Sequence, residues 1–408
     1  MTAAIIITVC GLLLLAYIFD LTSSRTKIPA VILLFVLGWA AKQIGDFLEL
    51  PIPDLTDLLP IFGTIGLVLI VLEGSLELEL NKSKIPLIGK TMLGALVPIF
   101  GLSFLLAFTF QQFGDFSFKD SLTNAIPLCI ISSAIAIPSV KNFSRRNKEF
   151  VTYESSLSDI FGVIFFNFVA LNATIELKSF GIFGLQILLI IIVSFIATVG
   201  LAFLLSKIGH HVKFAPIVIL VIVIYEVSKM YHLPALVFIL LFGVFIGNLD
   251  ELKTIGWIKK LKPEELNKEV SKFKEIVIMG SFLIRSIFFM LFGYLMDLAE
   301  VLNSATILWA LGITAGIFFL RIVQLYISRL PVRPLAFIAP RGLITILLFL
   351  AISPSQMIPL VNRSLIVQVI ILTALVMMIG LWTSNDKEES VLAPAGLPKD
   401  DFPLDFPG

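Results

Sequence analysis

The chain has 408 residues, of which 58% are hydrophobic and only 14% charged, and its mean hydropathy is +1.01. A soluble domain carries about a quarter charged residues, so this composition excludes a soluble protein and predicts a polytopic membrane protein. The net charge of +1 gives no bulk electrostatic attraction to nucleic acid. Cys10 and Cys129 lie in apolar runs without a metal-binding spacing, and we expect no cofactor.

The first apolar segment is interpreted as a retained span, because residues 1–4 lack the basic start of a signal peptide. A membrane helix needs about 20 mostly apolar residues. The sequence predicts thirteen spans, at about 3–20, 28–46, 57–75, 85–111, 119–140, 150–173, 183–207, 213–230, 233–248, 272–297, 305–328, 335–352 and 363–383. The eighth and ninth are separated only by the turn at 232–234.

Along the chain, loops rich in lysine and arginine alternate strictly with loops that contain few of them. This alternation predicts the orientation in the membrane. One set, which we call the basic side, holds most of them, including Lys27, Lys141 and the cluster in 249–271. The other set holds only Lys42, Lys119, Lys178, Lys229 and Arg363. We therefore expect a plasma-membrane (cell inner membrane) protein with its N-terminus outside and its C-terminus in the cytoplasm.

Two segments outside the spans have a distinct composition. The loop at 249–271 is rich in Lys and Glu, and it suits either a short amphipathic surface helix or a solvated linker. Residues 384–408 place prolines among acidic residues and are predicted to be a disordered cytoplasmic tail. We expect no nucleotide-binding regulatory domain after the last span.

The fifth and twelfth spans carry residues that interrupt helices. Ser132, Ser133 and Pro138 lie in the fifth, and the run Pro-Arg-Gly at 340–342 lies in the twelfth. Proline removes a backbone hydrogen bond, and matching breaks in two halves of a chain are typical of inverted-repeat transporters. Both spans are therefore predicted to unwind where they cross, although an isolated proline often produces only a kink.

The sixth span carries a polar stripe on an otherwise apolar helix. Glu154, Ser155, Ser158, Asp159 and Gly162 fall on one side at helical spacing. An ionised carboxylate near the middle of the bilayer costs roughly 2.5–3.5 kcal/mol, so it must face water or a partner charge. This stripe is the candidate functional site.

The other ionisable residues deep in the spans are Arg285, Arg321 and Arg341, with Glu73 nearer a span end. Because an isolated buried charge is costly, two acids and three bases suggest pairing. A carboxylate without a permanent partner can exchange a proton for a cation. We favour Asp159 for this role, since the hydroxyls of Ser155 and Ser158 can bind an alkali ion, and a permanent salt bridge is its alternative. For Glu154 we favour the salt bridge.

Four motifs in this order resemble the monovalent cation/proton antiporter superfamily, on the sodium/proton exchanger (NhaP-like) branch. In chain order they are LEGSLEL at 72–78, YESSLSD at 153–159, FLR at 319–321 and PRG at 340–342. The resemblance runs over essentially all the predicted spans. It implies an all-α membrane protein of about 13 transmembrane helices, with inverted repeats and crossed discontinuous helices. This fold is that of the sodium/proton antiporters.

The resemblance also implies roles for individual residues. Asp159 would bind Na+ and H+ in alternation, and Glu154 would pair with Arg321. Ser155, Ser158, Ser132, Ser133 and Glu73 would complete or line the ion site, while Arg285 and Arg341 are candidates for gating or charge compensation. A homodimer is implied, with a transmembrane antiporter domain at 1–383. Its moving core would comprise about 85–173 and 305–383, and its dimerisation scaffold about 1–75 and 213–297.

The sequence departs from the family where an acid is usual in the fifth span, since Ser133 stands in the crossover, and Ser158 replaces an asparagine. We expect an electroneutral antiporter that exchanges Na+ for H+ and is not an enzyme. It would lie in the lipid bilayer, act in pH homeostasis and bind no nucleic acid. A K+/H+ antiporter is the first alternative, and Li+ is a further candidate ion. A cation-coupled symporter of an organic solute on the same fold is an alternative of another class.

Overall fold

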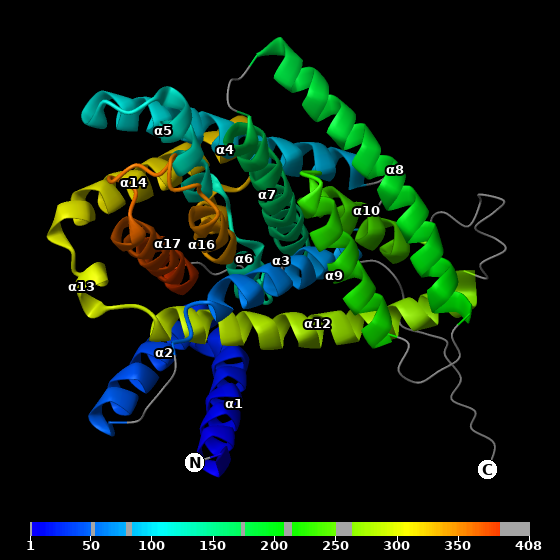
Figure 1. Cartoon of the computed structure of the whole chain (residues 1–408), viewed down its shortest axis with the longest axis horizontal. Helices are drawn as coiled ribbons and strands as arrows, with labels where there is room; N and C mark the ends of the chain where they lie inside the picture. The colour runs from blue at the N-terminus through cyan, green and yellow to red at the C-terminus, as the bar shows by residue number, and fades with distance from the viewer. Residues whose placement is uncertain are drawn as a thin grey trace, which may run out of the picture.

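The structure is a computed structural model that describes residues 2–49, 54–78, 84–172, 176–207, 214–249 and 263–383. Every regular element within these ranges is helical (Figure 1). Residues 250–262 of the Lys- and Glu-rich loop, and the predicted tail at 384–408, lie outside the described residues.

The first half of the chain forms α1 (Thr2–Thr26), α2 (Ala30–Phe47), α3 (Leu58–Glu77), α4 (Ile85–Gly114), α5 (Phe118–Ala125), α6 (Ser133–Ser139) and α7 (Arg145–Leu171). The second half forms α8 (Leu177–Lys207), α9 (Phe214–Met230), α10 (Ala235–Gly247), α12 (Pro263–Tyr294), α13 (Leu298–Val301), α14 (Ser304–Ile327), α15 (Val332–Leu335), α16 (Leu343–Leu350) and α17 (Arg363–Thr383).

Each predicted span coincides with one helix or with a pair of short helices. Nine stretches in the described part of the chain are long and apolar enough to cross a membrane, and α1, α9, α10 and α15–α16 correspond to the remaining predicted spans. The turn that ends α9 and precedes α10 contains His232 in a left-handed conformation, with a φ of 57°. The tenth span differs most from its predicted bounds, because α12 begins at Pro263, inside the predicted loop.

Helix α12 is a long helix that in Figure 1 runs below α4, α5, α14, α16 and α17. Helix α12 packs along α2 and α3, and α3 packs in turn against α10. Close approach here depends on small residues, because a Cβ on Gly38 or Gly293 would strike the backbone of the neighbouring helix at Met290 or Phe35. Helices α4, α7, α14 and α17 form a second group, in which α4 contacts α5, α7 and α14, and α14 contacts α17.

Candidate functional site

Helix α7 carries the polar stripe, and its five residues are all buried. Gly162 matters for this packing, because the side chain of Ile130 occupies the space that a Cβ at Gly162 would need. Ile130 belongs to the unwound part of the fifth span. The absence of a side chain at Gly162 therefore lets α7 lie directly against the break.

The predicted breaks in the fifth and twelfth spans are confirmed. After α5 the chain makes a 3-10 turn at Ile126–Cys129, is extended at Ile130, and becomes helical again at Ser133. In the twelfth span, residues 338–342 are non-helical between α15 and α16. The two unwound segments meet where the backbone N–H of Ser132 donates to the carbonyl of Pro340, at 2.9 Å. Segments of this kind are tolerated at membrane depth only inside the protein or beside a cavity.

Asp159 points at this crossing. The hydroxyl of Ser133 donates to its Oδ2, and the backbone N–H of Ser133 donates to the same oxygen at 3.3 Å. The other carboxylate oxygen, Oδ1, has no hydrogen-bond partner within the part of the chain that the structure describes, and neither has the hydroxyl of Ser132. Both residues are only 1% exposed, and Asp159 forms no ion pair with any described residue. The crossing thus contains an acid without a fixed counter-charge.

Ser158 and Ser155 have hydrogen bonds of their own. The Oγ of Ser158 accepts from the backbone N–H of Ile131 at 3.0 Å, a donor that the break in the helix leaves free. Ser155 donates to the carbonyl of Val151 at 2.7 Å, which leaves the lone pairs of its oxygen available. Ser158 therefore holds the crossing in place, and Ser155 lies one turn before Asp159 on the same helix.

Glu154 and Arg321 of α14 form a buried ion pair. The Nε of Arg321 also donates to the carbonyl of Leu335 at 3.2 Å, and its guanidinium lies 5.9 Å from the ring centre of Phe150. Gln324, one turn further along α14, accepts from Arg321 at 3.4 Å. Sequence reasoning missed Gln324, although a buried amide in an apolar span is a signal that could have found it.

Arg341 is buried in the unwound part of the twelfth span, and carbonyl groups surround it. It donates to Leu128 at 2.7 Å, to Ala339 at 2.9 Å and to Cys129 at 3.3 Å. Leu128 and Cys129 end the first half of the broken fifth span, where the helix dipole places partial negative charge. Arg341 therefore has carbonyl dipoles as partners where pairing with an acid was expected.

Glu73 and Arg285 lie on α3 and α12, outside the crossing. Glu73 is half-buried, and the positive charge of Arg285 on α12 acts on its carboxylate. Arg285 also donates to the carbonyl of Ala134, at 3.4 Å. The predicted ion-site residue Glu73 is thus placed next to Arg285, and Arg285 reaches the residue that follows Ser133.

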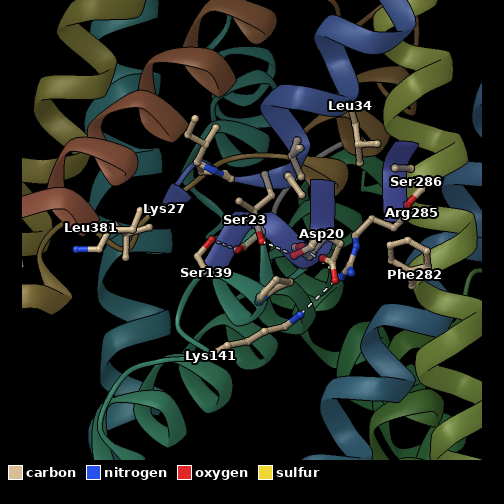
Figure 2. A pocket seen from close by; sticks show the side chains of 18 of the residues that line it. Asp20, Ser23, Lys27, Leu34, Ser139, Lys141, Phe282, Arg285, Ser286 and Leu381 are labelled. Atoms are coloured by element: carbon tan, nitrogen blue, oxygen red, sulfur yellow. Dashed lines mark hydrogen bonds and ion pairs between the residues drawn. The ribbon is translucent and has the colours of Figure 1, made fainter. Parts of the chain in front are cut away.

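A cavity of about 220 Å³ leads from the basic side of the protein to this point. Figure 2 shows Arg285 pointing into it from α12, with Asp20 of α1 and Lys141 nearby. Ala134 and Ile135 of α6 line the wall next to the crossing. The cavity wall therefore includes Ala134, which directly follows Ser133 in the chain.

The comparisons with known proteins agree with this geometry. The family described as "Sodium/hydrogen exchanger, transmembrane" matches residues 10–385. Among solved structures, the sodium proton antiporter MjNhaP1 from Methanocaldococcus jannaschii at pH 8 is similar, with a TM-score of 0.66 and 17% identity over 94% of this chain and 96% of that one. An electron-microscopy map of the same antiporter matches equally well, with a TM-score of 0.66 and 17% identity over 94% of this chain and 96% of that one.

No curated protein matches the chain in sequence. At 17% identity the solved structures establish the fold alone. The family match covers most of the chain and establishes the family. The chain therefore belongs to the sodium/hydrogen exchanger family, and it is a cation/proton antiporter of the membrane rather than an enzyme.

Proposed function

We propose that the chain exchanges Na+ for H+, one for one, by alternating access at Asp159. The observation that carries this proposal is the buried Oδ1 of Asp159, which has no partner in the described part of the chain. A buried carboxylate without a counter-charge must bind either a proton or a cation to avoid a large desolvation cost. Competition for this one oxygen couples the two ions.

The proposed ion site uses oxygen ligands from both α7 and the crossing. Asp159 supplies the charge, and the hydroxyl of Ser132, which has no hydrogen-bond partner among the described residues, is a further candidate ligand. Ser133 orients the carboxylate, while Ser155 and Ser158 line the site. Hard cations favour such oxygen ligands. The transported Na+ is a substrate, so the site needs no resident metal.

The one-for-one stoichiometry follows from the charges at the crossing. Glu154 has a fixed partner in Arg321, and position 133 is a serine, so Asp159 is the acid left to exchange. One acid can hold one proton or one monovalent cation, and the cycle then moves no net charge. Glu73 would line the route to the site, where the positive charge of Arg285 acts on it, and Arg285 and Arg341 would balance charge in the empty state.

The choice of Na+ rests on the family description and on the similar antiporter, whose title names sodium. The runner-up is K+, which the hydroxyl-rich run at 132–133 favours because it lacks a second acid to hold a small ion tightly. We infer that the basic side faces the cytoplasm and that two copies form a homodimer. We also propose that α4–α7 with α14–α17 move as a core against a scaffold that contains α1–α3, α9, α10 and α12.

Transport by the purified protein in lipid vesicles tests the proposal. An imposed pH gradient is discharged with Na+, K+ or Li+ outside, and the internal pH is followed with a trapped dye. We expect proton flux that depends on the cation, with Na+ the most effective. Proton flux with K+ alone would identify K+, not Na+, as the transported cation. A lack of cation-dependent flux, alongside a control antiporter that is active, would refute exchange.

A further inference from the structure

The wall of the cavity contains an ion pair to which the transport mechanism assigns no role. Asp20 lies in α1, and its Oδ2 is 3.3 Å from the Nζ of Lys141, two residues after α6 ends (Figure 2). The side chains of Lys141 and Asp20 are 48% and 22% exposed. Water therefore reaches the pair, and it can break and re-form without trapping a bare charge.

The two partners belong to different groups of helices. Helix α1 packs against α2 and α12. Lys141, in contrast, lies in the turn between α6 and α7, so it is fixed to the elements that hold Ser133 and Asp159. A second contact also joins the two groups of helices. The indole N–H of Trp382 at the end of α17 donates to the carbonyl of Thr26 at the end of α1, at 2.9 Å.

We propose that the Asp20–Lys141 pair is a latch that stabilises the conformation with the cavity on the basic side. This inference rests on the proposed function, because it requires the core to move against the scaffold. Such a movement would carry Lys141 away from Asp20 and would leave contacts within each group unchanged. A contact made in only one of two states shifts the population toward that state.

The expected size of the effect is modest. Exposed ion pairs change a two-state ratio by roughly 1.5- to 5-fold. Removing the latch should raise the ratio of the opposite conformation to this one by that factor, and the population of the opposite conformation rises by nearly the same factor while it is the minor one. A reporter that reacts only in the opposite conformation is therefore the sensitive one.

Leu343 offers such a reporter. It is 1% exposed on α16 of the core, and its side chain lies against Gly66 of α3 in the scaffold. A cysteine there becomes reachable when α16 and α3 separate. The background replaces both native cysteines, Cys10→Ala and Cys129→Ala, and carries Leu343→Cys. The protein is placed in lipid nanodiscs, and the rate of reaction with a polar maleimide is measured.

We expect Asp20→Asn and Lys141→Met each to raise the labelling rate roughly 1.5- to 5-fold, and the exchanged pair Asp20→Lys/Lys141→Asp to return it to the parent rate. The matched control is Asp297→Asn, which breaks the 2.6 Å pair between Lys42 and Asp297 within the scaffold and should leave the rate unchanged. Parent-like rates in both single variants would overturn the latch. So would an exchanged pair that labels as fast as the single variants. Labelling needs no ion flux, so this result is independent of whether Na+/H+ exchange itself is observed.

Discussion

The carboxylate of Asp159 has one oxygen bonded to Ser133 and one without a partner in the described residues. Asparagine keeps the shape of this side chain but can hold neither a titrating proton nor a negative charge. We expect Asp159→Asn to reduce exchange in vesicles to the level of empty vesicles, with an unchanged elution volume and melting temperature in detergent. Exchange at the parent rate would remove Asp159 from the ion site.

The ion pair of Glu154 and Arg321 has a structural role that can be separated from transport. Each residue is 1% exposed, so removing one partner leaves the other as an unpaired buried charge, at a cost of about 3–5 kcal/mol. Glu154→Gln and Arg321→Gln should each lower the melting temperature, and the double variant should lose clearly less than the sum of the two. Additive losses would show that the two charges do not stabilise each other.

At the scale of the elements, the crossing depends on close contact between α6 and α16. A Cβ on Gly342 would lie 2.6 Å from Cδ1 of Ile135 and 2.9 Å from Oγ of Ser132. Overpacking of this kind costs about 1–3 kcal/mol, and here it displaces a proposed ligand. We expect Gly342→Ala to weaken the apparent affinity for the cation roughly tenfold, since tenfold corresponds to about 1.4 kcal/mol, which lies within this range.

Gly316→Ala in α14 is the matched control for this change, because its Cβ would meet only Cδ1 of Leu102, at an ordinary 3.7 Å. The affinity is read from the cation concentration that gives half-maximal exchange. Equal effects of the two alanines would show that the contact at Gly342 does not shape the ion site.

The ends of α2 and α12 are joined by the exposed pair of Lys42 and Asp297. The hydrogen bond from Lys42, followed by its positive charge, holds the pKa of Asp297 below its ordinary value of 3.8. A lowered pKa in the folded state means that the pair stabilises the protein above the unfolded pKa and loses this contribution as pH falls through the folded pKa. The free energy of unfolding should therefore exceed that of Asp297→Asn by a few tenths of a kcal/mol near pH 6, and this difference should disappear as the pH falls through the lowered pKa of Asp297.

Thermal melts in detergent at a series of pH values measure this difference, because both proteins share every other titrating group. A gap between parent and variant that stays constant or widens toward low pH would contradict the assigned pairing.

At the scale of the whole molecule, the proposed exchange of one cation for one proton moves no net charge. The initial rate of exchange should therefore not change when the membrane potential of the vesicles is clamped between 0 and roughly −100 mV, where each net charge moved would gain about 2.3 kcal/mol. A clear and saturable dependence on voltage would reject this stoichiometry. Arg285→Gln would then be the variant to compare, because Arg285 is the charged side chain at the inner end of the cavity.

The parts of this fold that follow from local chemistry could be predicted from the sequence. Apolar length predicted the spans, Pro340 and the serines at 132–133 predicted the breaks, and helical spacing predicted the buried stripe on α7. Contacts between distant segments could not be predicted in the same way. Two carbonyl partners of Arg341, at Leu128 and Cys129, come from more than 200 residues away, and a sequence pattern marks side chains but not backbone oxygens.

The interaction of Glu73 on α3 with Arg285 on α12 could not be predicted from the sequence either. A carboxylate near the end of a span can turn toward either neighbouring helix, and the rotation of α3 is fixed by its packing against α10 and α12, which periodicity alone does not reveal. The early start of α12 at Pro263 has a simpler reason. Lys and Glu are good helix formers, so the polar turns that precede the apolar span continue its helix toward the N-terminus.

The hydrogen bonds between α7 and the crossing tie the acid and its surroundings into one piece. The backbone N–H of Ile131 donates to Ser158, and that of Ser133 donates to Asp159. The crossing therefore cannot separate from α7 without breaking both hydrogen bonds. The proposed ligands would then be carried together between the two faces of the membrane, with the same intrinsic preference among ions on each face. Discrimination between Na+ and its competitors should then be equal in both directions of transport, even where the turnover rates differ.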